Sequence, residues 1–304
     1  MTSSFRAFRT AFRFGTAALR TSAVLRNRRA AVVGGVSTSL ALSFWSSAKP
    51  AESDDRLKGI PNYARVIEDS DLMYNMYLID NAYNILKKYS STENSELLWR
   101  LARVLCEKGK LSKDPNEKKQ LMYEAFSVVE KALKHEPKEG CFGAHKWYAI
   151  LLDYIGEIEG SKARIANSNT VKKHLERALE IDGKDATTWH ILGVWHFSFA
   201  DMSTLTRMAA QTIYGMVPNS TYEQALHYFM MAEKMDPDFY SANLFYIAEV
   251  YSRLGKTAEA LEYYKKCFMM RMVTADDLTY HNKAYINLKK AGVKDEELST
   301  SYRV

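Results

Sequence analysis

The chain has 304 residues, of which 47% are hydrophobic and 26% are charged, values typical of a soluble globular protein. Its 14 glycines and 6 prolines are too few for a β-sandwich or barrel with many tight turns. The net charge of +6 arises in residues 1–51, which hold eight basic and no acidic side chains. The remaining 34 basic residues (42 minus eight) face 36 acidic ones, which excludes a basic nucleic-acid-binding surface spread over the body.

Residues 1–51 have the pattern of a targeting segment. In a helix, Arg6, Arg9, Arg13 and Arg20 would share one arc, and Phe5, Phe8, Phe12 and Leu19 the neighbouring arc. This predicts a mitochondrial presequence, with a disordered basic arm as the alternative. The uncharged run from Ala30 to Ala48 is just long enough to span a bilayer, but its Gly, Ser and Thr make it a weak membrane segment. We expect this part of the chain to target the protein, or to associate with a membrane through residues 30–48.

From Asp69 to about Lys290 the apolar residues recur at helical spacing, as in the run Leu72–Tyr89, and no segment alternates like a β-strand. A repeated pattern of a small residue, a bulky apolar one four later and a small one three later marks the second helix of a tetratricopeptide hairpin. It recurs at Ala125, Val129, Ala132; at Val171, Leu175, Ala178; at Ala225, Phe229, Ala232; and at Ala260, Tyr264, Cys267. Matching first-helix patterns precede them in "LWRLARVL", "WYAILLDY", "WHILGVWH" and "LFYIAEVY".

The spacing therefore predicts an all-α fold, a tetratricopeptide-like right-handed superhelix of antiparallel helix pairs. Two irregular insertions interrupt the repeat, one near residues 160–169 and one at residues 200–220, where we expect a short extra helix. The predicted organisation is an N-terminal segment at 1–51, a helical domain at 52–290 and a C-terminal tail at 291–304.

The sequence contains no recognisable catalytic or metal-binding motif. The "GKT" at Gly255 lacks the earlier glycine of a phosphate-binding loop. His190 and His196 are six residues apart, so they point away from each other on a helix and cannot share a metal ion. Cys106, Cys141 and Cys267 have no short spacing, which indicates reduced structural thiols. We expect a protein that is not an enzyme and that needs no metal or cofactor.

Binding is the expected role, because stacked hairpins curve and their first helices line the concave side. Nine residues are predicted to face this groove: Trp99, Arg103, His145, Tyr148, Leu152, His190, Val194, Phe197 and Phe245. The groove would be aromatic and apolar, suited to an apolar peptide or a lipid chain. The alternative is that a terminal helix of the chain folds into the groove and covers these residues.

Several phrases of the sequence resemble a known family. They are "SELLWRLAR" (Ser95–Arg103), "AHKWYAI" (Ala144–Ile150), "SKARIANS" (Ser161–Ser168), "KDATTWHILGVW" (Lys184–Trp195) and "STYEQALHYFMMAEKMDPDFYSANL" (Ser220–Leu244). Together they look like the regulator of microtubule dynamics proteins over roughly residues 65–290. The resemblance implies an adaptor that associates with microtubules at the mitotic spindle. It also implies members at mitochondria and a branch that binds phospholipid at membrane contacts.

Two functions remain open from the sequence. Microtubule association needs basic residues, because tubulin exposes acidic tails. The candidates are Lys110, Lys113, Lys118, Lys119, Lys172 and Lys173. The alternative is a module that binds a lipid or another apolar ligand at mitochondrial membranes. The N-terminal segment indicates the mitochondrion, whereas the family resemblance implies the cytoplasm, the cytoskeleton, the spindle and the spindle pole.

Overall fold

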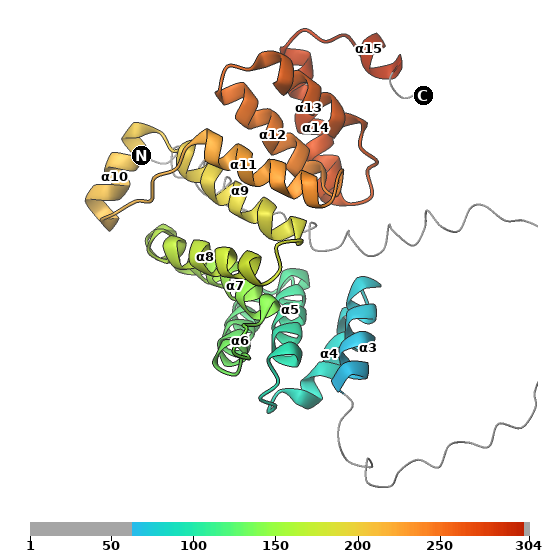
Figure 1. Cartoon of the computed structure of the whole chain (residues 1–304), viewed down its shortest axis with the longest axis vertical. Helices are drawn as coiled ribbons and strands as arrows, with labels where there is room; N and C mark the ends of the chain where they lie inside the picture. Colours follow the sequence, from blue (N-terminus) through green and yellow to red (C-terminus); the bar gives the residue numbers. More distant parts are fainter. Residues whose placement is uncertain (1–62, 301–304) are drawn as a thin grey trace, which may run out of the picture.

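The computed structural model describes residues 63–300, so the predicted targeting segment and the run 30–48 lie outside the described residues. The helices, labelled as in Figure 1, are α3 (Tyr63–Asn75), α4 (Ile79–Leu86), the short 3-10 helix η4 (Lys87–Tyr89), α5 (Ser95–Leu111), α6 (Pro115–Lys134), α7 (Phe142–Glu159), α8 (Ser161–Ile181), α9 (Ala186–Ala200), α10 (Thr204–Tyr214), α11 (Tyr222–Met235), α12 (Ser241–Arg253), α13 (Thr257–Met269), α14 (Ala275–Lys290) and α15 (Asp295–Thr300). Within this range no β-strand occurs.

Four helix pairs form the stack: α5 with α6, α7 with α8, α9 with α11, and α12 with α13. They follow one another through the molecule in chain order (Figure 1). Helices α3 and α4 precede the first pair and pack against α5, while α14 packs against α12 and α13 after the last pair. This arrangement confirms the predicted all-α, tetratricopeptide-like solenoid.

The repeated small and bulky positions of the second helices are the contacts that join each pair. The twelve predicted residues of this pattern are all buried, none of them more than 5% exposed. Gly193 on α9 shows why the partner position must be small. A Cβ atom added there would lie 2.5 Å from Cδ1 of Phe229 on α11, well inside van der Waals contact. The pattern therefore marks positions at which two helices approach each other closely.

Local sequence sets where several helices begin. The side chains of Asn94, Asp114 and Asp185 accept hydrogen bonds from the first backbone N–H groups of α5, α6 and α9. Thr221 and Thr274 form capping boxes with Gln224 and Asp277 at the starts of α11 and α14. These bonds satisfy donors that would otherwise lack partners at a helix N-terminus.

The second and third hairpins are joined by buried polar contacts. The Lys146 ammonium on α7 lies 2.8 Å from a carboxylate oxygen of Asp185, the residue that caps α9. The indole N–H of Trp195 on α9 donates to the carbonyl oxygen of Ser168 on α8 at 2.9 Å. The helix pairs therefore stay in register across this junction although both predicted insertions lie close to it.

The two insertions have different structures. The first, near residues 160–169, is absorbed into long helices, since α7 has 18 residues and α8 has 21. A buried ion pair between Asp153 and Arg164, 2.7 Å apart, holds the added turns together. The second forms the extra helix α10, as predicted, and Figure 1 shows that α10 stands out from the stack.

Two boundaries differ from the sequence prediction. The helical run Leu72–Tyr89 is broken after α3, where Tyr77 has a φ of 61°, so that α4 turns back toward α5. The packed body also extends beyond residue 290, because Val293 and Leu298 of the predicted tail are 8% and 4% exposed. Among the helices of residues 63–300, none is both long and apolar enough to cross a membrane.

Candidate functional site

The chain's own helix α3 covers the candidate groove residues of the first hairpin. On α5, Arg100 and Arg103 both donate to the carboxylate of Asp71 on α3, Arg100 at 2.8 Å. The Arg103 guanidinium also lies 3.8 Å from the ring centre of Tyr74 on α3, a cation–π contact. Trp99 lies under both arginines. Among the candidates of this hairpin, Arg103 is therefore engaged by α3, and whether a terminal helix covers the groove stays a prediction.

The candidates on α7 contact second helices instead of a groove. The Tyr148 ring lies 4.2 Å from the ring centre of His174 on α8 and 5.2 Å from that of Phe126 on α6. His145 contacts Glu136 and the same His174, and Leu152, a full turn beyond Tyr148, is 7% exposed. His190 on α9, which follows Trp189 as Tyr148 follows Trp147, likewise contacts a second helix through Phe229 of α11.

The candidates on α9 and α12 belong to a buried aromatic cluster. His190 is 2% exposed, and its Nδ1 is 3.0 Å from the amide oxygen of Asn243. The ring of Phe197 lies 5.4 Å from that of Tyr246, which also stacks on Phe229. Phe245 lies among Tyr246, Tyr264 and Tyr280, and Val194 is 1% exposed. These side chains contact each other in the described structure, and a binding role for them stays a prediction.

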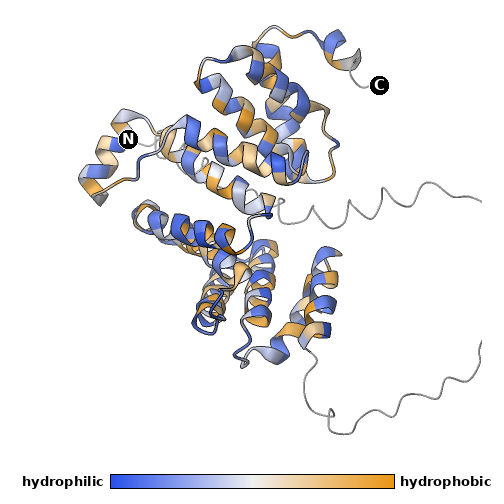
Figure 2. Cartoon of the chain, viewed as in Figure 1, coloured by the Kyte–Doolittle hydropathy of each residue, from blue (hydrophilic) through white to orange (hydrophobic). Residues whose placement is uncertain are grey.

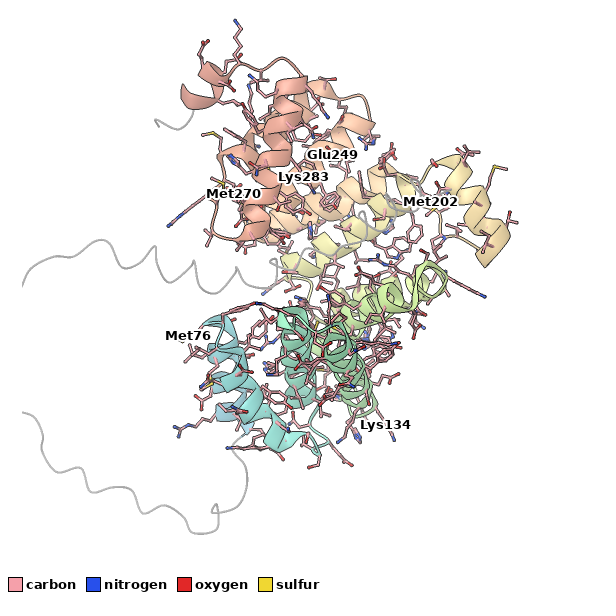
Figure 3. The ribbon with its side chains drawn as sticks, turned by 180° about the vertical axis from the view of Figure 1, so that it is seen from behind. Met76, Lys134, Met202, Glu249, Met270 and Lys283 are labelled. Carbon is pink, nitrogen blue, oxygen red and sulfur yellow. The ribbon has the colours of Figure 1, made fainter. Side chains whose placement is uncertain are left out.

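Figure 3 shows the polar edge of this cluster, where Glu249 of α12 and Lys283 of α14 are labelled. Glu249 accepts hydrogen bonds from the Tyr264 hydroxyl and from the Asn287 amide. The Lys283 ammonium lies 4.6 Å from the ring centre of Tyr280. These polar contacts join the last hairpin to α14. They also engage side chains that surround Phe245.

The histidines of these clusters are uncharged at neutral pH. Burial lowers the pKa of His190 to about 4. Burial, with His145 and Lys173 nearby, lowers the pKa of His174 to about 4. His196 has a pKa of about 4 because it is buried and lies near Lys172 and His227. These three histidines therefore add no positive charge to the clusters in which they lie.

The cysteines have the properties of packing residues. All three are buried, and burial raises the pKa of Cys106 and of Cys267 to about 12 and that of Cys141 to about 11. A protonated thiol is a poor nucleophile. Within residues 63–300 no group of three histidine, cysteine or acidic side chains is placed to hold a metal ion.

The predicted basic candidates separate into exposed and paired residues. Lys113, Lys118 and Lys119 are exposed at the turn from α5 to α6 and on the first turn of α6. Lys110 instead folds back, with a side chain 10% exposed and 2.7 Å from Glu107, so it does not contribute to that surface. On α8, Lys172 lies 3.4 Å from Glu176, whereas Lys173 is exposed.

The acidic residues around the α5–α6 turn are occupied locally. Asp114 accepts a hydrogen bond from the backbone N–H of Asn116, and Glu117 accepts one from the Ser112 hydroxyl. Among the described residues, neither Lys113 nor Lys118 forms an ion pair. The three lysines Lys113, Lys118 and Lys119, here named the tip lysines, therefore present positive charge to solvent.

Sequence reasoning missed two features of the described structure. The first is helix α3, whose Asp71 and Tyr74 cover α5; its own residues carried no repeat pattern. The second is the apolar face of the predicted helix α10, on which Leu205, Met208 and Ile213 are exposed. Their spacing of three and five residues in a short helix was a signal that could have been read as an apolar face.

Comparison with known proteins gives the family. The profile of "Regulator of microtubule dynamics protein 1-3" matches residues 66–292. The chain is 43% identical over 190 residues to "Regulator of microtubule dynamics protein 1" of Pongo abelii, covering 62% of this chain and 60% of that protein. It is 31% identical over 196 residues to "Regulator of microtubule dynamics protein 2" of Mus musculus, covering 64% of this chain and 47% of the relative.

The match to the first of these relatives spans about 60% of the relative's length. Among solved structures, a thermophilic TPR protein of Thermus thermophilus matches 73% of this chain and 98% of its own at 13% identity, with a TM-score of 0.48. At this TM-score the structural likeness says nothing further about the chain. The family profile, in contrast, covers most of the helical body. The chain belongs to the family of regulator of microtubule dynamics proteins 1-3.

Proposed function

We propose that the chain is a non-enzymatic adaptor that associates with microtubules through the tip lysines. The family's printed name supports a role connected with microtubules. The observation that carries the proposal is the exposed position of Lys113, Lys118 and Lys119, whose neighbouring acids Asp114 and Glu117 are hydrogen-bonded to the Asn116 backbone and to the Ser112 hydroxyl. Exposed positive charge attracts the acidic tails of tubulin over roughly the Debye length of 8–10 Å.

The test is co-sedimentation of the full chain with polymerised tubulin. The double variant Lys118→Gln/Lys119→Gln should weaken binding about 2- to 30-fold, because each exposed charge pair contributes roughly 0.2–1 kcal/mol. Binding of the unchanged protein should also fall as salt is raised, since exposed charges are screened.

A matched control is available at the far end of the solenoid. Lys265 and Lys266 are also adjacent and exposed on a helix, α13. Their replacement by glutamine removes the same charge and should leave co-sedimentation within about twofold. Equal weakening by both pairs, or no weakening by either, would contradict the assignment to the tip lysines.

The alternative, an apolar ligand or lipid in the groove, has less support. Six of its nine candidate residues are buried against neighbouring side chains, and Arg103 is engaged by α3. A ligand would have to displace these contacts. The mitochondrial setting depends on residues 1–51, outside the described range, and the spindle setting follows from the family resemblance, so both stay predictions.

A further inference from the structure

Helix α10 exposes apolar side chains that a helix of a packed body normally buries. Leu205 is 81% exposed, Met208 and Ile213 are each 58% exposed, and Met216, just beyond the helix, is 87% exposed. At 100° per residue one side of the helix carries Leu205, Met208, Ala209, Thr212 and Ile213. These five residues, with the exposed Met216 that follows Gly215, are named here the α10 stripe. Figure 2 shows apolar turns on α10, away from the stack.

The side of α10 opposite the stripe is fixed to the body. Arg207 donates hydrogen bonds to the carbonyl oxygen of Pro218 at 2.8 Å, to the Asn219 side chain at 3.0 Å and to the carbonyl oxygen of Phe199. Ala210 is only 3% exposed. The stripe cannot rotate inward without breaking these contacts, so its exposure is built into the fold.

The charge pattern shows what kind of surface the stripe fits. From Ser203 to Val217 the sole charged residue is Arg207, which is already bonded to the body. The Thr212 hydroxyl donates to the Met208 carbonyl oxygen at 2.9 Å, which satisfies it within the helix. The stripe therefore offers apolar area without acidic groups that would repel anionic headgroups, and recognition depends on apolar burial.

A second copy of the chain is a poor occupant. A stable protein interface uses about 20–30 residues on each side, whereas the stripe has six on a helix that projects from the stack (Figure 1). A bilayer, in contrast, accepts one face of a single amphipathic helix at the boundary between headgroups and acyl chains. The area available therefore favours a lipid surface.

The rest of the chain provides a second reason for a membrane. The uncharged residues 30–48 are the candidate membrane segment, and residues 49–62, which number 14, link them to α3. A chain of that length reaches at most roughly 50 Å. If residues 30–48 bound a bilayer, they would hold the solenoid near its surface. The high effective concentration of the bilayer would then allow one weak apolar contact to form.

We propose that the α10 stripe docks on the surface of a phospholipid bilayer, with Leu205, Met208, Ile213 and Met216 lying at the level between headgroups and acyl chains. This contact is separate from the tip lysines on the α5–α6 turn. It orients the solenoid on a membrane and does not require the groove to open.

The test places an environment-sensitive NBD label on the full chain as Met216→Cys. The native cysteines are at most 2% exposed, so the introduced thiol reacts selectively. With phosphatidylcholine vesicles, the emission should shift to the blue and be quenched by lipids that carry a nitroxide near the headgroup. The same label at Lys134→Cys on α6, labelled in Figure 3, should show neither change.

The lipid concentration that gives half of the blue shift shows which residues bind the bilayer. In the labelled chain, Leu205→Ser with Ile213→Ser should raise the lipid concentration for half-maximal shift at least fivefold. The control pair Leu278→Ser and Ile286→Ser removes the same two residue types, each 51% exposed, from α14 and should change this lipid concentration less than twofold. No shift at position 216 with vesicles, a shift that grows with protein concentration without vesicles, or equal effects of both pairs would each overturn the proposal.

Discussion

Replacement of Arg164 by methionine is expected to lower the free energy of unfolding at pH 7.5 by about 3–5 kcal/mol, because it leaves the carboxylate of Asp153 buried without a partner. Both side chains are 5% exposed, and two hydrogen bonds of 2.8 and 2.7 Å join them. The two helices are in close contact at Gly156, because a Cβ atom there would lie 2.9 Å from the Arg164 Cα. Water therefore cannot easily enter between them to solvate the carboxylate. Urea denaturation followed by circular dichroism measures the change.

The pH dependence of that loss distinguishes an unpaired charge from a packing defect. Burial already raises the pKa of Asp153 to about 6 although Arg164 opposes the shift. Without the guanidinium the folded-state pKa rises further, while the unfolded value stays near 3.9. The folded variant then binds a proton more readily than the unfolded one, so its deficit relative to the parent should shrink as the pH falls from 7.5 to 5.

The control for this prediction is the double variant Asp153→Asn/Arg164→Met. It removes the buried charge together with its partner, so its deficit at pH 7.5 should be smaller than that of the single variant. Toward pH 5 its deficit should grow instead of shrinking, because the parent gains stability as Asp153, with a folded-state pKa of about 6, takes up a proton and the double variant has no such group. The histidines with lowered pKa, among them His190, lose stability on acidification in every variant and therefore cancel in the difference. A deficit of the single variant that is constant from pH 7.5 to 5 would contradict the assignment.

Gly193→Ala is expected to lower the free energy of unfolding by about 1–3 kcal/mol, the range for an overpacked core. The added methyl group would overlap the ring of Phe229, which is fully buried and stacked on Tyr246. Thermal unfolding and urea denaturation both report the change. The effect should be largest at the contact between α9 and α11, which hydrogen exchange can locate.

Two comparisons separate a clash from a general effect of glycine. Gly183→Ala is the matched control, because its nearest contact would be the Leu179 carbonyl oxygen at an ordinary 3.4 Å. It should change stability by less than about 0.5 kcal/mol. Adding Phe229→Leu to Gly193→Ala should cost less than the sum of the two single changes, since the smaller side chain leaves room. Strict additivity would show that the two residues do not collide.

The sequence could predict those parts of the fold that depend on contacts within one helix or between adjacent helices. The small residues at Gly193, Ala225 and Ala232 mark places where two backbones approach, and each is found at such a contact. Hairpin pairing and the extra helix α10 follow from the same spacing and from polar breaks in the apolar pattern. These features depend on the residues of one or two adjacent helices.

The candidate site was harder to predict because it depends on contacts between distant segments. Nothing in the pattern around Arg103 indicates that Asp71 and Tyr74 of α3 cover it. Nothing in the spacing around Tyr148 indicates that its ring contacts Phe126 of α6 and His174 of α8. The burial of Lys110 likewise depends on its pairing with Glu107.

The most direct test of the proposed adaptor role is carbodiimide crosslinking of the full chain to polymerised tubulin, analysed by mass spectrometry. This reagent joins a lysine amine to a carboxylate only when the two are in contact. The proposal predicts crosslinks from Lys113, Lys118 or Lys119 to acidic residues of tubulin, lost in about 0.5 M salt as screening shortens the Debye length. Crosslinks confined to other lysines, such as Lys265 and Lys266, or binding to microtubules without any crosslink from the tip lysines, would contradict it.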